Sequence, residues 1–460
     1  MSDNTICLQL KKLLSSEAQV QPGDAVDARL LTDFLGYEKG HAEVYVKAAC
    51  AEDVRAAVAF ACEHRMSVTV RAAGTNLVGS TIPQGGLVLD VSGMNRILEL
   101  DEENRTITVE PGVLLCDLQA YVEERGLFYP PDPAEKNATV GGNIATNAGG
   151  MRAVKYGVTR DYVLGLEVVT PDGRLVDLGS KCLKDSTGLN LKQLFIGSEG
   201  TLGVITRCVL RLIDKPESTC HALVGFKSLR EAITSVNEIK QALLEPTAIE
   251  FIERKVIALG EQFTGKSFPM PECSAYLVVT FDGRVGEPDH RLQRCREVLE
   301  PFHNIEFLPL TDPAISSDVW TVRSALAKAV QTSGLWEPVD TVVPLSDIAT
   351  FVDYVSELSE KSGIRILAFG HAGDGNVHLC ILKDDLPVEK WPDTLTYILS
   401  SLYRRVYELK GKVAAEHGLG RHKRNYFLKE VDPQELALMR AVKAAFDPHN
   451  LFNPHSGYSL

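Results

Sequence analysis

The sequence lacks several patterns that would assign it at once to a common functional class. No two of its ten cysteines are spaced as C-x-x-C, which excludes the common iron–sulfur clusters and cysteine-rich zinc sites within this chain. No apolar run reaches the roughly 18 residues that a membrane-spanning helix needs. The opening MSDNTICLQLKKLL has neither the apolar core of a signal peptide nor the arginine-rich composition of a transit peptide. Because scattered cysteines also suit a reducing compartment, we expect a cytoplasmic protein without a transmembrane segment.

Positive charge is also in short supply. The chain has 48 Lys and Arg residues against 61 Asp and Glu, so its formal net charge is −13. Binding to DNA or RNA requires clustered cations that neutralise phosphates, and we therefore expect no nucleic-acid partner. A length of 460 residues suggests about three domains, or two of which one is enlarged.

The standard nucleotide-binding motifs G-x-G-x-x-G and G-x-x-x-x-G-K-[ST] are missing, but three other glycine-rich segments are present. They read RAAGTNLVGS (residues 71–80), TVGGNIATNAGG (139–150) and GSEGTLGVITR (197–207). Any one of them could be an ordinary turn. Together they favour an organic cofactor with a diphosphate, because such loops let backbone N–H groups approach phosphate oxygens closely.

Hydrophobic periodicity predicts alternating strands and helices on both sides of a boundary at Lys215-Pro216-Glu217-Ser218. Before it we expect strands at 43–49, 68–71, 86–91, 106–110, 164–170 and 174–178, a helix at 52–66, and a long loop at 126–150. After it we expect strands at 221–226, 275–281, 365–370 and 376–382, a helix capped by Ser228 and Glu231, and helices at 292–299, 316–332 and 395–410. After the boundary, this alternation with antiparallel pairs predicts an α+β domain.

Two segments of the second half combine histidine with carboxylate. In GHAGDGNVH (370–378), His371 and His378 flank a turn that can bring both imidazoles to one side of a hairpin. In AEHGLGRHK (415–423), Glu416 and His417 follow a helix end. Two histidines and one carboxylate form a ligand set for catalytic zinc with an open position, and equally for non-haem iron. The alternative is that these histidines only make structural hydrogen bonds.

The three glycine-rich segments, together with YPPDP (129–133), resemble the FAD-linked oxidases of the vanillyl-alcohol oxidase/p-cresol methylhydroxylase superfamily. The resemblance is closer to their D-2-hydroxyacid dehydrogenase branch, which includes the glycolate oxidase flavoprotein subunit, D-lactate dehydrogenases and D-2-hydroxyglutarate dehydrogenase. It runs from about residue 40 to the end of the sequence. It implies a two-subdomain FAD-binding domain of the p-cresol methylhydroxylase type (41–215), an α+β substrate or cap domain (216–415), and a C-terminal helical segment that returns to the flavin site (416–460). Before these domains we expect an N-terminal helical segment (1–40).

The resemblance also implies how FAD is held. The diphosphate would lie on the first glycine loop, the flavin near the second, and the backbone of strand residues after the third would close the site. The implied cofactor-binding residues are Ala73, Gly74, Thr75, Asn76, Gly79, Ser80, Pro133, Gly141, Gly142, Asn143, Thr146, Asn147, Gly149, Val204 and Ile205. Relatives with covalent flavin carry a histidine at the position of Thr75, and a hydroxyl cannot form that bond, so we expect non-covalent FAD.

The catalytic roles follow from the same resemblance. His371, His378 and Glu416 are the expected ligands of a divalent metal, with zinc first and iron or manganese as alternatives. His417 is the expected general base, because a neutral imidazole has a pKa near working pH. Arg323 in DVWTVR is expected to bind the substrate carboxylate, and Lys423 to add positive potential. A solvated charge on a helix face is the alternative for Arg323.

Two departures from the branch bear on the substrate. Hydroxyglutarate-type relatives have a lysine where this chain has Pro338, and an asparagine where it has Cys380. Both changes remove polar groups that could hold a distal carboxylate, so a small 2-hydroxyacid such as D-lactate or glycolate is favoured. D-2-hydroxyglutarate dehydrogenation, other flavin chemistry on the same fold, and a flavin electron-transfer subunit of a larger complex stay open. Without C-x-x-C, the electrons need a separate acceptor unless oxygen serves. The resemblance implies an electron-transferring flavoprotein, an iron–sulfur subunit or a quinone.

Overall fold

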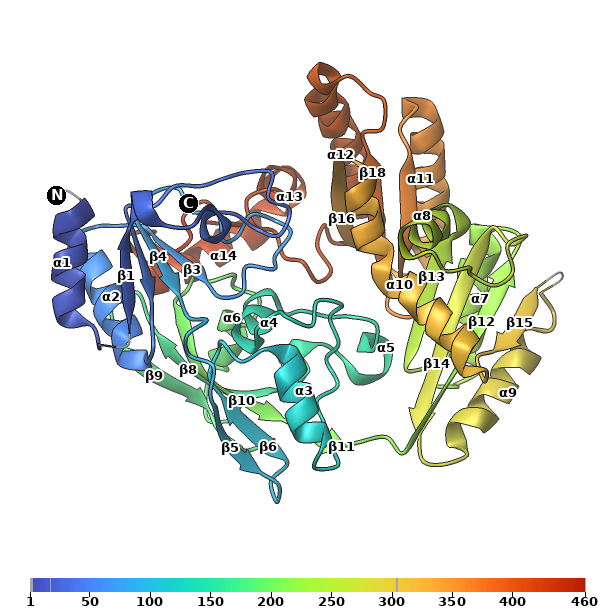
Figure 1. The fold of residues 1–460 in the computed structure, drawn as a ribbon, viewed down its shortest axis with the longest axis horizontal. Helices are drawn as coiled ribbons and strands as arrows, with labels where there is room; N and C mark the ends of the chain where they lie inside the picture. Colours follow the sequence, from blue (N-terminus) through green and yellow to red (C-terminus); the bar gives the residue numbers. More distant parts are fainter. Residues whose placement is uncertain (1–2, 17, 303–304, 460) are drawn as a thin grey trace. The chain divides into compact units, whose positions relative to one another are not determined.

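The computed structural model describes residues 3–16, 18–302 and 305–459, which form two compact units (Figure 1). The first unit contains Met1–Ala148, Val158–Lys215 and Glu416–Leu460. The second contains Gly149–Gly157 and Pro216–Ala415. Both units combine helices with sheets, so the α+β fold class predicted from the sequence is confirmed.

The first sheet of the first unit has the strand order β1-β2-β4-β3. Its strands are β1 (Gln19–Pro22), β2 (Val44–Lys47), β3 (Val68–Arg71) and β4 (Leu87–Asp90), with β1 antiparallel and the others parallel. Helices α1 (Asp3–Leu13) and α2 (Ala51–Glu63) bury apolar residues in the same core as the strands. The strands and the helix predicted here are confirmed. The segment before residue 41 contains the expected helix, and β1 adds an edge strand.

The second sheet of the first unit is antiparallel, in the order β5-β6-β10-β8-β9. Its strands are β5 (Ile97–Asp101), β6 (Thr106–Val109), β8 (Val163–Val169), β9 (Leu175–Gly179) and β10 (Val204–Arg211). Helix α3 (Leu115–Glu123) follows β6, and the short strands β7 (Leu127–Phe128) and β11 (Ile213–Asp214) pair with each other.

The prediction of one long loop at 126–150 is wrong, because this stretch contains helix α4 (Val140–Thr146). Thr139 caps the helix, its hydroxyl oxygen accepting a hydrogen bond from the Gly142 amide at 3.2 Å. Asn147, in the left-handed conformation with φ 52°, ends it. Two glycines lower the intrinsic helix propensity here, which is why periodicity did not reveal the helix.

The second unit is built on a seven-stranded antiparallel sheet in the order β15-β12-β14-β13-β17-β18-β16. Its strands are β12 (Ser218–Phe226), β13 (Ala248–Glu253), β14 (Ala275–Gly283), β15 (Glu306–Pro309), β16 (Trp336–Val342), β17 (Ile366–His371) and β18 (Asn376–Leu382). The predicted strands are confirmed, and β13, β15 and β16 are additional.

Helices pack against this sheet and against one another (Figure 1). They are α7 (Leu229–Gln241), α8 (Arg254–Thr264), α9 (Glu287–Leu299), α10 (Pro313–Ser333), α11 (Ile348–Ser362) and α12 (Trp391–Glu408). Ser228 caps α7 as predicted. At the contact between α8 and α10, a Cβ on Gly260 would come within 2.9 Å of Val322 and Leu326 side-chain atoms. A side chain at that position would therefore push the two helices apart.

Residues 149–157 belong to the second unit because a buried carboxylate holds them there. Asp282 on β14 accepts hydrogen bonds from the Tyr156 hydroxyl at 2.9 Å and the Thr247 hydroxyl at 2.7 Å, and it forms an ion pair with Lys155. Lys155 and Tyr156 lie on the short helix α5 (Ala153–Tyr156). A segment that interrupts the first unit in sequence is thus part of the second.

Within the part of the chain that the structure describes, no helix has the length and apolar character needed to cross a membrane.

The C-terminal segment of the first unit is anchored by a buried ion pair. Lys443, on α14 (Pro433–Phe446), donates to Asp447 at 2.5 Å and to the carbonyl oxygens of Thr201 at 2.7 Å and Phe452 at 2.8 Å. Both charged side chains are almost fully buried. Lys443 therefore ties the C-terminal segment to the third glycine-rich segment.

Lys443→Met should lower the free energy of unfolding by about 3–5 kcal/mol, because Asp447 would be left as a buried charge without its cation. Urea denaturation followed by far-UV circular dichroism measures the change, and the same substitution at exposed Lys12 on α1 is the control. Equal stability of the two variants would contradict this account of the anchor.

Candidate active site

The first glycine-rich loop of the first unit offers backbone N–H groups to a ligand. In residues 73–76 these groups donate no hydrogen bond to another described residue of the unit, and the residues are exposed or half-buried. Gly74 adopts φ +71°, and a Cβ there would lie 2.1 Å from the Arg71 guanidinium. Successive unpaired N–H groups in a turn form a concavity that binds anions. This arrangement fits the diphosphate expected here.

The remainder of this loop is held rigid by side-chain hydrogen bonds. The Asn76 amide oxygen accepts from the Ser80 amide at 3.0 Å and the Val78 amide at 3.3 Å, while its NH₂ group donates to the Thr81 hydroxyl at 2.7 Å. Gly79 donates its amide N–H to Asp33 at 3.1 Å. Asn76 and Gly79 therefore shape the loop, and the adjoining residues present the free amides.

The residues predicted to line the flavin from the second loop lie on or beside α4. Gly141 and Asn143 are buried, whereas Gly142, Thr146 and Asn147 are half-buried. A Cβ on Gly141 would come within 2.5 Å of the Pro111 side chain, so this position requires glycine. Pro133 is half-buried in the preceding turn, Gly149 belongs to the second unit, and Val204 and Ile205 begin β10.

A buried glutamate from the third glycine-rich segment joins the other motifs of the first unit. Glu199 adopts φ +50° and accepts hydrogen bonds from the Ser80 hydroxyl at 2.6 Å and from the amides of Leu419 and Gly420 at 2.8 and 2.9 Å. Burial raises the pKa of its carboxyl, and these hydrogen bonds oppose that rise. Glu199 therefore fixes the backbone just after His417 to the first glycine loop.

Lys423, predicted to add positive potential for the substrate, is buried and contributes to the same environment. Its charge favours the ionised form of Glu199 and so also opposes the rise in that pKa. Lys423 therefore interacts electrostatically with Glu199, and both residues belong to the first unit.

In the second unit, one face of the sheet brings together three of the six predicted catalytic, metal and substrate residues: His371, His378 and Arg323. His371 on β17 lies opposite Glu250 on β13, and His378 on β18 lies opposite Asp340 on β16. The imidazoles of His371 and His378 meet edge to face, with ring centroids 5.1 Å apart. The hairpin predicted from GHAGDGNVH therefore does bring both histidines to one side of the sheet.

Arg323 reaches this face from α10. It is only 7% exposed, which rules out the alternative of a solvated helix-face charge. Its Nε donates to Glu250 Oε2 at 3.1 Å, and its Nη2 contacts the same oxygen. Burial alone would raise the pKa of Glu250, but its electrostatic interactions and hydrogen bonds with His371 and Arg323 lower that pKa to about 2.

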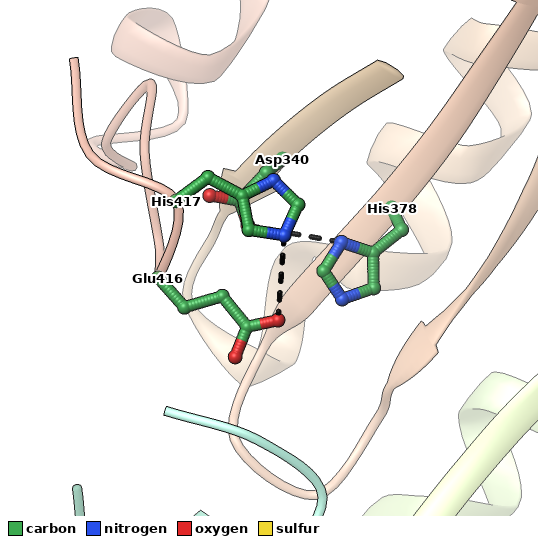
Figure 2. Close-up of side chains that lie close together, drawn as sticks. All are labelled: Asp340, His378, Glu416 and His417. Atoms are coloured by element: carbon green, nitrogen blue, oxygen red, sulfur yellow. Dashed lines mark ion pairs between the residues drawn. The ribbon is translucent and has the colours of Figure 1, made fainter. Parts of the chain in front are cut away.

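Four side chains form a cluster that could hold a metal ion (Figure 2). Asp340, His378, Glu416 and His417 each offer one ligand atom, and these atoms lie within 4.8 Å of one another. Glu416 and His417 directly follow Ala415, whose amide N–H donates to Asp340 Oδ2 at 3.0 Å. Of the three predicted ligands the cluster includes His378 and Glu416, and His371 packs against His378 beside it. Imidazole and carboxylate together suit zinc, iron or manganese.

Asp340 is fully buried and is held by specific donors. Its Oδ1 accepts from the Asn376 amide group at 2.9 Å and lies 3.8 Å from His378 Nδ1. The sequence analysis did not identify Asp340, Glu250 or Glu199. Each is an acidic residue in a strand or a glycine-rich turn, and the scarcity of Asp and Glu in strands was the one signal available in the sequence.

The two departures noted in the sequence turn out to be neighbours. Pro338 on β16 lies directly opposite Cys380 on β18, two residues along the strands from the pair Asp340 and His378. Side chains two residues apart project from the same face of a strand, so both changes border the metal-competent cluster. Cys380 is buried and its pKa is raised by desolvation, so it is a neutral apolar thiol.

Both halves of the chain match known domain families. Residues 42–179 match the family described as FAD binding domain, and residues 215–456 match FAD linked oxidases, C-terminal domain. The chain is 39% identical to D-lactate dehydrogenase from Anaerostipes hadrus, covering 95% of this chain and 94% of that protein. It is 37% identical to glycolate oxidase subunit GlcD from Bacillus subtilis, covering 85% of this chain and 84% of that protein.

A solved structure of p-cresol methylhydroxylase with substrate bound is similar in fold. The TM-score is 0.82 at 17% sequence identity, over 99% of this chain and 96% of that one. The predicted fold type is therefore confirmed. With both domain families matched in order and a relative 39% identical along nearly the whole chain, this protein is an oxidoreductase of the FAD-linked oxidase family.

Proposed function

We propose that this protein is an FAD-dependent dehydrogenase that oxidises a small D-2-hydroxyacid, of the D-lactate or glycolate type, to the 2-oxoacid. The observation that carries the proposal is the convergence of two features on one face of the second unit's sheet: the buried Arg323, and the pair of histidines His371 and His378, which could bind a metal. A 2-hydroxyacid presents a carboxylate and a neighbouring hydroxyl, which these two features would recognise. The names of the relatives point to the same substrate class.

FAD would be held by the first unit. The unpaired amides of residues 73–76 suit its diphosphate, and α4 with the turn at Pro133 suits the flavin. When bound, FAD supplies the hydride acceptor, flavin N5. We propose non-covalent attachment, because Thr75 has no ring nitrogen with which to form a bond to the flavin.

A divalent metal would be held by His378, Glu416 and His371, with zinc first among zinc, iron and manganese. When bound, it would lower the pKa of the substrate hydroxyl. Asp340 lies within reach of the same position and is fixed by Asn376 and the Ala415 amide. It would therefore hold His378 in place or serve as a further ligand.

Three further residues would bind the substrate, accept its proton or act through Glu199. Arg323 would bind the substrate carboxylate with the edge of its guanidinium that Glu250 does not occupy. His417 would accept the hydroxyl proton, since its imidazole is partly exposed and adjoins Glu416. Lys423 would contribute indirectly, through its charge on Glu199.

The pair Pro338 and Cys380 supports a short substrate. Neither side chain can hydrogen-bond strongly to a second carboxylate, and both lie on one side of the cluster. D-2-Hydroxyglutarate would leave its distal carboxylate beside this apolar pair at a desolvation cost. We keep D-2-hydroxyglutarate dehydrogenation as the second candidate, because relatives of that name are 32% identical to the chain.

The electrons must leave the flavin for a separate acceptor. The ten cysteines are free thiols, and the sequence has no C-x-x-C pair for a cluster of its own. We propose an electron-transferring flavoprotein, an iron–sulfur subunit or a quinone as the acceptor. Free thiols also suit the reducing environment of a cytoplasm.

The direct test is reduction of dichlorophenolindophenol by the purified protein with a panel of D- and L-2-hydroxyacids. D-lactate or glycolate should give the highest kcat/KM, and D-2-hydroxyglutarate a lower one. A preference for the L-enantiomers, or activity with none of the acids, would contradict the proposal. A preference for D-2-hydroxyglutarate would select the second candidate.

His417→Ala should slow flavin reduction by roughly 10²–10⁴-fold, the usual contribution of a positioned general base. Arg323→Ala should mainly raise KM, with some loss of rate because hydride transfer depends on alignment. Anaerobic stopped-flow absorbance at saturating substrate separates the two effects.

Both variants should retain FAD that acid precipitation releases from the chain, which provides the control for cofactor loss. If His417→Ala reduces its flavin at the wild-type rate, the base is another group and His417 is structural.

A further inference from the structure

Glu250 divides its two carboxylate oxygens between two groups of the proposed site. Oε2 accepts from Arg323, with Nε at 3.1 Å and Nη2 in contact, while Oε1 accepts from His371 Nδ1 at 2.5 Å. The side chain is 0% exposed. A single buried carboxylate thus contacts both the arginine on α10 and the histidine at the end of β17.

The register of strands β13 and β17 and the packing of Arg323 hold these three side chains in place. Glu250 and His371 are direct partners in the β13–β17 register, so their side chains leave the same face of the sheet at the same level. Arg323 also lies over the Phe369 ring, with 5.8 Å between its Cζ and the ring centroid. The three charged or polar side chains therefore have little freedom to exchange partners.

The contacts with Glu250 determine which atoms of Arg323 and His371 would bind a ligand. An ionised carboxylate only accepts hydrogen bonds, so His371 carries a proton on Nδ1, and Nε2 is the ring nitrogen through which it would bind a metal. Glu250 also occupies the Nε side of the Arg323 guanidinium, so a substrate carboxylate would bind to the edge that includes Nη1.

We propose that Glu250 is a positioning residue that holds the substrate-binding arginine and the metal-binding histidine in one geometry. This inference rests on the proposed function and extends it to a residue outside the ligand and substrate sets. It implies that metal affinity and substrate affinity depend on the same carboxylate, and that both weaken when its charge is removed.

Glu253 offers a matched control on the same strand. It is three residues further along β13, so it projects from the opposite face, and it accepts a hydrogen bond from the Ala368 amide at 2.7 Å. Glu253→Gln keeps an oxygen for that amide and makes the same chemical change as Glu250→Gln, away from Arg323 and His371.

The experiment compares Glu250→Gln with Glu253→Gln and wild type in the full-length holoprotein. Zn²⁺ affinity is measured by competition with a chromogenic chelator, and KM and kcat by dye reduction with the preferred 2-hydroxyacid. We expect Glu250→Gln to weaken Zn²⁺ binding by about 10–100-fold, as for other carboxylates behind a metal-binding histidine. KM should rise roughly tenfold, as expected for losing a charged hydrogen bond. FAD content should be unchanged, and Glu253→Gln should match wild type within twofold.

Wild-type Zn²⁺ affinity and KM in Glu250→Gln would overturn the inference, and so would equal losses in Glu253→Gln. If Glu250→Gln does not fold, Glu250→Asp provides the same comparison, because its shorter carboxylate keeps the charge but cannot span both partners. Full Zn²⁺ affinity and KM in that variant would likewise overturn it. A wild-type protein that neither binds Zn²⁺ nor oxidises a 2-hydroxyacid would refute the proposed function as well, whereas failure of the variants alone refutes only the role of Glu250.

Discussion

The buried carboxylate of Glu250 is the constraint on which the proposed site depends. A charge in the middle of a sheet is costly unless cations and hydrogen-bond donors surround it. Arg323 supplies a cation and hydrogen-bond donors, and His371 supplies a further donor. This explains why α10 has a buried arginine and why the last residue of β17 is a buried histidine opposite Glu250. The groups that would bind a substrate carboxylate and a metal are the same groups that make the burial of Glu250 tolerable.

Two other buried carboxylates act in the same way on the chain around them. Asp340 holds Asn376 and the Ala415 amide, and thereby the start of the segment that carries Glu416 and His417. Glu199 holds the first glycine loop and the amides of Leu419 and Gly420, just beyond that segment. Hydrogen bonds to acidic side chains therefore hold the backbone on both sides of Glu416 and His417. Gly418 lies so close to the Glu199 carboxylate that a Cβ there would clash with it.

The sequence predicted the fold class, most strands and helices, and the motifs that meet on the sheet face. His371 and His378 were predictable because a turn of known length joins them, and Arg323 because its motif resembles that of a family. Helix α4 was missed because glycines weaken its propensity. Glu199, Glu250 and Asp340 were missed because their partners come from distant segments, and only the folded chain shows which donors surround each carboxylate. That residues 149–157 belong to the second unit was likewise not predictable, because it depends on their hydrogen bonds to Asp282.

The central claim is that a metal ion in the second half of the chain assists hydride transfer to FAD. The most direct measurement is anaerobic flavin reduction by D-lactate in protein stripped of metal with a chelator, before and after addition of Zn²⁺. We predict that stripped protein keeps its FAD but reduces it at least about 100-fold more slowly, as expected when the substrate hydroxyl loses a Lewis acid. Zn²⁺ should restore the rate. Full-rate flavin reduction by protein shown to be free of metal would contradict the claim.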